Sequence, residues 1–219
     1  MAIAASSASS YPVSIEVDPT TDPRNKLTVA FRIILSIPHA LLVGGFISFG
    51  AVFYQTDLGN FGGALNAGVL GAVAGICAVI SWFAILFANQ HPQGLRDLGT
   101  FYLRWKVRAM AYMALFRDEY PPFGDSEYPS RLHVDLAEFP RDKLSVGLRI
   151  IYVIPHAICL FFLGIGWFVT SVIAWFAILI TGEYPESLYN FGMGVFRWQM
   201  RVEAYMLLLV DQYPPFSLE

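Results

Sequence analysis

The sequence predicts an all-α membrane protein with four transmembrane helices, arranged as two parallel two-span repeats. Three observations lead to this fold class. Hydrophobic residues make up 56% of the 219 positions and charged residues only 14%, which lies outside the usual balance of soluble proteins. Four apolar runs occur, at 27–50, 66–88, 144–164 and 166–182. The second half of the chain repeats the first.

The four apolar runs predict the membrane topology. The first two exceed the roughly 20 residues that a helix needs to cross a bilayer. The last two follow each other so closely that they predict a helical hairpin with its turn near 164–166. All 14 Lys and Arg residues then lie on or near one side, opposite this turn and the loop at 51–65. The positive-inside rule predicts that both termini are cytoplasmic.

The repeat covers nearly the whole chain after a tail, residues 1–10, that we expect to be flexible. Residues 11–123 form the first copy and residues 128–217 the second, so that "FRIILSIPHA" at 31–40 matches "LRIIYVIPHA" at 148–157. His39 recurs as His156, an offset of 117, whereas Trp82 recurs as Trp175, an offset of 93. The first copy therefore holds a 24-residue insertion. Two spans per copy predict parallel repeats around a pseudo-twofold axis along the membrane normal.

Each copy is expected to begin with a short cytoplasmic strand, because apolar residues alternate at Val13, Ile15 and Val17 and at Leu132 and Val134. The two strands are expected to pair, since a lone strand leaves backbone groups unsatisfied.

Each copy is expected to end with an interfacial amphipathic helix, at about 94–117 and about 187–210. Charged residues near the middle of these segments make membrane insertion costly, at about 2.5 to 3.5 kcal/mol each. Headgroup contacts are predicted for an aromatic and basic set, namely Arg104, Trp105, Arg108, Arg197, Trp198 and Arg201.

The strongest candidates for a polar or ligand-binding site are Arg32 with His39 and Arg149 with His156. Seven residues separate the members of each pair, which places them on one helix face. The imidazoles can hydrogen-bond across the bundle and fix the kink at the preceding prolines. Alternatively, the Arg–His faces bind an anionic headgroup or small amphiphile. A third hypothesis is that the two histidines ligate haem or a chlorophyll-type pigment, although no cofactor or other metal site is predicted.

Ala67, Gly71 and Gly75 form a small-residue stripe that predicts close helix packing. Two further histidines, His91 in a loop and His133 in a strand, are expected to be solvated. The chain contains no phosphate-cradling glycine loop, no HExxH or CxxC motif, and no Ser-His-Asp arrangement that we can build on one membrane face. We therefore expect no enzyme activity.

Several of these motifs, "YPVSIEVD", "RIILSIPH", "WFAILFANQHPQGL" and the repeated Tyr-Pro-Pro-Phe ending, resemble a bacterial membrane family catalogued as domain of unknown function 4389. The resemblance covers nearly all of residues 11–217, in two tandem copies, and the insertion departs from the pattern. It implies an integral, multi-pass protein of the bacterial inner (cytoplasmic) membrane. It supplies no activity, substrate or site residue.

These observations lead us to expect a structural, accessory or assembly subunit of a larger membrane complex. Its expected partners are membrane lipids and other membrane protein subunits, with no nucleic acid. The alternative is a protein that binds or transports a lipid or small amphiphile. A haem- or pigment-binding role through His39 and His156 is the third hypothesis.

Overall fold

The computed structural model describes residues 11–20, 23–45 and 61–219, with only the backbone described for residues 61–67. The expected tail at 1–10 and most of the 51–65 loop therefore lie outside the described residues. The elements in chain order are β1 (Val13–Val17), α1 (Lys26–Ala30), α2 (Arg32–Val43), α4 (Phe61–Ala88), α5 (Gln93–Met113), β2 (Ser130–Val134), α6 (Lys143–Thr181) and α7 (Glu186–Met206).

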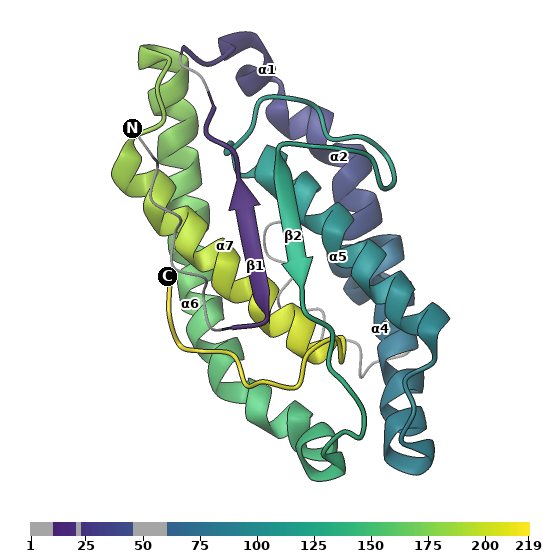
Figure 1. Cartoon of the computed structure of the whole chain (residues 1–219). Coiled ribbons are helices and arrows are strands. Elements are labelled where there is room, and N and C mark those ends of the chain that lie inside the picture. The colour runs from purple at the N-terminus through teal and green to yellow at the C-terminus, as the bar shows by residue number, and fades with distance from the viewer. Residues whose placement is uncertain (1–10, 21–22, 46–60) are drawn as a thin grey trace, which may run out of the picture.

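The elements form three layers (Figure 1). The first layer holds α6 on one side and α2 followed by α4 on the other. The middle layer holds α5, which packs on α2 and α4, and α7, which packs on α6. The two-stranded sheet covers the middle layer, with β2 against α5 and β1 against α7.

The predicted hairpin at 144–182 is wrong, because α6 is one helix of 39 residues. It begins where the Asp142 carboxylate caps the Leu144 amide and ends at Gly182, which adopts a left-handed conformation. The segment at 164–166 has glycines but no turn-forming proline or asparagine. Glycine in a helix costs about 1 kcal/mol relative to alanine, which continued backbone hydrogen bonding offsets.

Two helical segments, Gly68–Ala88 and Lys143–Thr181, are long and apolar enough to cross a membrane, as judged by length and composition. The apolar helix α2 has only 12 residues, well short of the roughly 20 that a crossing needs. The four predicted spans are therefore not supported. The second apolar run, 66–88, corresponds closely to the first of these segments.

Together α2 and α4 form a broken counterpart of α6. The repeat aligns Val43 with Leu160 and Gly68 with Phe161, which are consecutive in α6. The 24-residue insertion thus lies where the long helix of the first copy is interrupted. Gly68 has φ 73°, and a Cβ there would lie 2.4 Å from the Leu42 carbonyl carbon. Only glycine fits where the two helix ends meet.

The two long helices run antiparallel and are held by equivalent tryptophans. Trp175 donates to the Val29 carbonyl oxygen at 2.8 Å, and its counterpart Trp82 donates to that of Val146 at 2.9 Å. The start of each long helix therefore meets the end of the other. A twofold axis that relates antiparallel helices runs perpendicular to them.

The sheet lies on this pseudo-twofold axis. The strands β1 and β2 are antiparallel, and Ile15 is opposite its own counterpart, Leu132. The predicted strands and their mutual pairing are confirmed. The side chains of Val13, Ile15 and Leu132 are buried and face the helices. On the exposed face of the sheet, Glu16 lies directly opposite Arg131.

The core is centred on α5 and α7. Both helices occur close to their predicted positions, but most of their second halves are buried: residues 106–112 of α5 and 198–202 of α7 are fully covered. Trp167 of α6 packs with Phe116 and Phe196, at ring distances of 6.2 and 5.9 Å. These helices are thus central packing elements, not peripheral ones.

Candidate functional site

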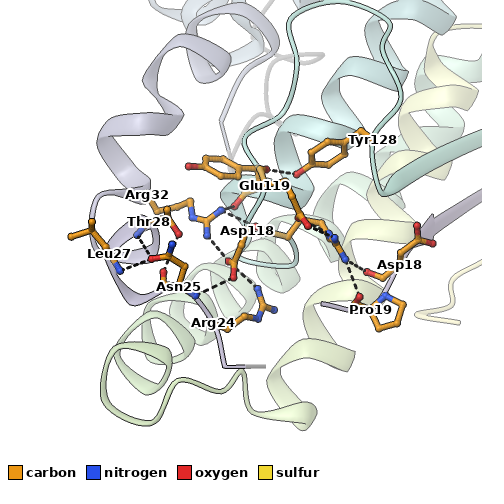
Figure 2. A network of polar contacts seen from close by, with 12 residues as sticks. Asp18, Pro19, Arg24, Asn25, Leu27, Thr28, Arg32, Asp118, Glu119 and Tyr128 are labelled. Carbon is orange, nitrogen blue, oxygen red and sulfur yellow. Dashed lines mark hydrogen bonds and ion pairs between the residues drawn. The ribbon is translucent and has the colours of Figure 1, made fainter. Parts of the chain in front are cut away.

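The first polar cluster joins the start of α2 to the end of α5 (Figure 2). Arg32 donates to the carbonyl oxygens of Tyr112 at 3.3 Å and Arg117 at 2.7 Å, and to the Asp118 carboxylate at 2.7 Å. Arg24 reaches the same carboxylate at 3.1 Å. The guanidinium of Arg32 lies 4.0 Å from the Tyr112 ring centroid, a cation–π distance. One carboxylate thus holds two arginines at a helix end.

The second copy builds the same cluster from equivalent residues. Arg149 donates to the carbonyl oxygens of Tyr205 and Val210 and, at 2.8 Å, to the Asp211 carboxylate. Arg141 also binds this carboxylate, corresponding to Arg24. Burial of Asp211 opposes its ionisation, but the hydrogen bonds and positive charges of Arg141 and Arg149 prevail and hold its pKa below the ordinary range.

These clusters neutralise the carbonyl ends of α5 and α7. The last carbonyls of a helix lack partners within it and carry partial negative charge, which a buried arginine matches. In each copy the backbone then turns through a residue in the left-handed conformation, Leu115 in the first copy and Leu208 in the second. Sequence reasoning missed Asp118 and Asp211 as partners of the two arginines. The repeated Asp two residues before Tyr-Pro-Pro-Phe was the available signal.

Each histidine lies in an aromatic box of its own repeat. Trp105 donates to Nδ1 of His39 at 3.2 Å, and Trp198 donates to Nδ1 of His156 at 3.0 Å. Phe123 stacks on His39 at 4.6 Å, and Phe216 stacks on His156 at 4.0 Å. Both imidazoles are fully buried. The repeated Ile-Pro-His-Ala therefore anchors the Tyr-Pro-Pro-Phe segment of the same copy.

The hydrogen bonds determine the histidine tautomer. Indole nitrogen is only a donor, so each Nδ1 must be the unprotonated acceptor, and a neutral ring then carries its proton on Nε2. A metal-ligating Nε2 needs the opposite tautomer, in which Nδ1–H donates to an acceptor. This tautomer does not suit haem or pigment ligation at Nε2, and that hypothesis stays a prediction.

One buried charge pair breaks the pseudo-symmetry. Lys106 of α5 contacts both carboxylate oxygens of Glu203 of α7 at 2.7 Å, and the Tyr102 hydroxyl donates to the same carboxylate at 2.7 Å. The counterpart of Lys106 in the second copy is Gln199 and that of Glu203 in the first copy is Met110. Burial, followed by the charge of Glu203, raises the Tyr102 pKa well above its ordinary value. The pair fixes α5 against α7.

The residues predicted to contact headgroups are divided between surface and core. Arg104 has a half-exposed side chain, and Trp105 and Arg197 are partly buried. Trp198, Arg108 and Arg201 are buried. Arg108 binds Asp125 at 2.7 Å and Arg201 binds the carbonyl oxygens of Ser217 and Glu219, so both hold loops of their own chain.

The predicted small-residue stripe lies on α4. Gly71 is buried and Gly75 partly buried, while the side chain of Ala67 lies outside the described residues. The neighbouring Ala74 and Ser81 are also buried, at 1% exposure each. Because α4 packs on α5 and α6, small residues here serve contacts within the chain.

A surface groove of about 720 Å³ is lined by residues of β2, of the loop that precedes it and of α5. Three arginines and three carboxylates line it, and these are Arg104, Arg108, Arg131, Asp18, Asp125 and Glu127. Arg108 pairs with Asp125 at 2.7 Å and Arg131 with Asp18 at 3.3 Å. The charges balance, so the groove is a polar surface without a strong preference for anions or cations.

No cluster of three or more His, Cys, Asp or Glu side chains that could hold a metal ion occurs among the described residues. The four sequence-predicted candidates, Arg32, His39, Arg149 and His156, are brought into two equivalent regions where each contacts its own repeat. The terminal guanidinium nitrogens of the two arginines donate to backbone carbonyls and carboxylates of the chain, and Nδ1 of each histidine accepts from an indole.

Comparison with known proteins gives a family but no described relative. No curated protein and no solved structure matches the chain. The family described as Domain of unknown function (DUF4389) matches twice, at residues 63–124 and 143–217. The second match contains α6, α7 and their Arg–His region, and the first contains the equivalent α4 and α5. With more than half of its residues matched in two copies, the chain belongs to the DUF4389 family.

Proposed function

We propose that this protein is a membrane-resident structural or accessory component, and that it supports the assembly of a larger membrane complex without catalysing a reaction. The observation that carries this proposal is the distribution of exposed apolar side chains. Among the described residues, the exposed large hydrophobic side chains of helices belong to the first layer, α1, α2, α4 and α6, together with Phe31 between α1 and α2.

The extent of this apolar surface supports residence in a membrane. Fifteen large hydrophobic side chains of α6 are exposed, from Leu144 to Ile180. In each of the two span candidates, only 22% of the most apolar window is buried inside the protein. The core helix of a soluble protein is mostly buried, so these helices require an apolar environment outside the chain.

The polar side chains support a structural role. In both copies, the arginines and histidines that sequence analysis singled out bind the chain itself. An amphiphile carrier that used the Arg–His faces would first have to break the ion pairs of Arg32 with Asp118 and of Arg149 with Asp211. The opposite, polar face carries the sheet and the groove, and this face is the one available to protein partners.

The test is gentle purification from the native membrane at native expression, followed by identification of co-purifying chains. We expect stoichiometric membrane protein partners, and we expect their recovery to fall when the exposed sheet pair is altered by Glu16→Lys with Arg131→Glu. The matched control is His133→Ala, which removes an exposed side chain from the same strand. A protein recovered alone as a monomer under these conditions contradicts the proposal.

A further inference from the structure

We propose that the protein lies in a single leaflet, with α2, α4 and α6 parallel to the bilayer plane and the sheet facing water. The occupant of the apolar face is then lipid acyl chains, and neither candidate span crosses the membrane. This inference rests on the membrane residence proposed above and defines how the chain meets the bilayer. Three independent observations support it: helix length, the position of the charged sheet, and the pseudo-twofold axis.

The length of α6 does not suit a crossing. Its 39 residues extend over about 58 Å, nearly twice the roughly 30 Å hydrocarbon thickness. The exposed apolar side chains continue over the whole helix, with Ile150 near one end, Phe162 in the middle and Ile180 near the other. A spanning helix of this length would leave a long apolar segment in water or need an extreme tilt. A helix in the bilayer plane keeps its whole apolar face in lipid.

The position of the sheet is the second observation against a membrane crossing by α6. The sheet covers α5 and α7, and α7 in turn covers the middle of α6, where Trp167 meets Phe196 at 5.9 Å. If α6 spanned the bilayer, the sheet would lie at the hydrocarbon midplane. Its outer face carries Glu16 and Arg131, and Asp135 follows β2; all three have charged side chains and are exposed. Exposed charges at that depth are strongly disfavoured.

The pseudo-twofold axis gives the same answer. It passes through the Ile15–Leu132 pair and runs perpendicular to the antiparallel long helices. If those helices spanned the membrane, equivalent motifs of the two copies would lie at opposite membrane surfaces. When the helices lie in the plane, the axis is the membrane normal. Both copies then present their apolar helices to the leaflet and their strands to water.

The first experiment counts labels on a double-cysteine variant. Lys143→Cys with Glu183→Cys, in a Cys77→Ala, Cys159→Ala background, marks the two exposed ends of α6. The protein is reconstituted in sealed vesicles of phosphatidylcholine and phosphatidylglycerol, treated with a membrane-impermeant maleimide, and analysed by intact-mass spectrometry. We expect every molecule to carry two labels or none, whichever way it was inserted. A population with one label each places the ends on opposite sides and overturns the proposal.

A second double variant and a measurement on the unmodified protein guard against misfolding of the first variant. Lys26→Cys with Gln90→Cys marks the corresponding ends in the first copy and is expected to give the same two-or-none result. Infrared dichroism of the wild-type chain in oriented bilayers is expected to place the mean helix axis parallel to the bilayer plane. A mean axis along the normal overturns the proposal without any substitution.

The outcomes separate this inference from the proposed function. Two-or-none labelling with no co-purifying partner supports the leaflet position and contradicts the accessory role. Stoichiometric partners with one label per molecule support the accessory role and contradict the leaflet position. Protein that fails to float with the vesicles contradicts both the leaflet position and membrane residence.

Discussion

At the scale of single residues, each buried arginine contributes several directed hydrogen bonds as well as a positive charge. Arg149 has 2% of its side chain exposed and reaches two carbonyls and one carboxylate at once. The planar guanidinium provides several donors in a rigid geometry, whereas a lysine ammonium is a compact point charge on a flexible stem. The identity of the cation therefore matters here, beyond its charge.

We predict that Arg149→Lys lowers the free energy of unfolding by about 2 to 4 kcal/mol, because buried carbonyl and carboxylate groups lose partners. Denaturant unfolding in detergent micelles measures this change. Arg104→Lys is the matched control, since Arg104 is half-exposed and lies 3.5 Å from Asp125. It should change stability by no more than about 0.5 kcal/mol. Equal effects of the two substitutions would contradict the inference that the contacts of buried Arg149 stabilise the fold more than those of exposed Arg104.

His91 is a second buried group, although the sequence predicted a solvated loop histidine. It is 9% exposed, and burial followed by the positive charges of Arg141, Arg96 and Arg149 lowers its pKa to about 4. The unfolded chain binds this proton at about pH 6.5, and the folded chain does so only near pH 4. The contribution of neutral His91 to stability is therefore complete above about pH 6.5 and is lost as pH falls toward 4.

We predict that His91→Gln makes the loss of stability between pH 6.5 and 4 smaller than in the wild type, by at most about 3 kcal/mol. Urea unfolding at a series of pH values measures the slope. Gln90→Asn serves as the control, because Gln90 is exposed next to His91 and carries no titratable group, so this variant should leave the slope unchanged. An unaltered slope in the His91 variant would show that another group is responsible.

The sequence predicted which residues would be special but not what they contact. Arg32, His39 and their counterparts stood out because ionisable residues within apolar runs are rare. Their partners, Asp118 and Trp105 in the first copy, lie 86 and 66 positions away in sequence. Spacing along one helix gives the face on which a side chain lies, but only the packing of α2 against α5 decides what meets that face.

At the scale of elements, the strands were predictable and the spans were not. Alternation of apolar residues identifies a half-buried strand directly, and the repeat offset identified its partner. Apolar length alone does not distinguish a hairpin of two helices from one long helix, because both consist of continuous apolar residues. The close spacing of the two apolar runs favoured a turn near 164–166, yet α6 continues there, and Gly166 lies against the Phe191 ring, where a Cβ would be 3.5 Å away. A Cβ at that distance would make an ordinary van der Waals contact, so packing does not require glycine at this position.

The break between α2 and α4 gives a prediction at this scale. Deletion of residues 44–67 joins Val43 to Gly68 and recreates the register of Leu160–Phe161 in α6. We predict that the shortened chain folds, with an unfolding midpoint at or above that of the wild type, because a continuous helix replaces a broken one and the ends of a 24-residue insertion need not be brought together. Circular dichroism gives helix content and thermal unfolding gives the midpoint.

A matched control for this deletion removes only 22 residues, 44–65, which leaves two extra residues before Gly68 and turns α4 by about 200° relative to α2. That variant should lose stability or fail to fold. If both deletions are equally disruptive, α2 and α4 are not the two parts of one interrupted helix.

At the scale of the whole molecule, each of the three layers carries a different kind of side chain. Apolar side chains are exposed on the long helices, the buried ion pairs and histidine boxes lie around α5 and α7, and exposed charges are found on the sheet. The pseudo-twofold axis passes through all three layers, so both copies have the same orientation toward any surface perpendicular to it. A planar leaflet is such a surface, and the apolar layer has the length to cover it.

This arrangement predicts how the cost of an added charge varies along α6. Ile151, Phe162 and Ile173 are exposed by 59, 66 and 52%, lie on one face of α6 because 11 residues separate each from the next, and would be at a similar depth if the helix is in the plane. We predict that lysine at each of the three positions weakens vesicle binding to a similar extent, within about threefold, since long side chains reach the headgroups from each site. In a spanning helix the middle position would be far more costly than those about 16 Å to either side of it. Flotation with vesicles over a range of lipid concentrations gives the three binding constants, and a steep maximum at Phe162→Lys would favour a crossing. Glu16→Lys on the sheet is the control: a leaflet position leaves this residue in water, so its substitution should not weaken binding.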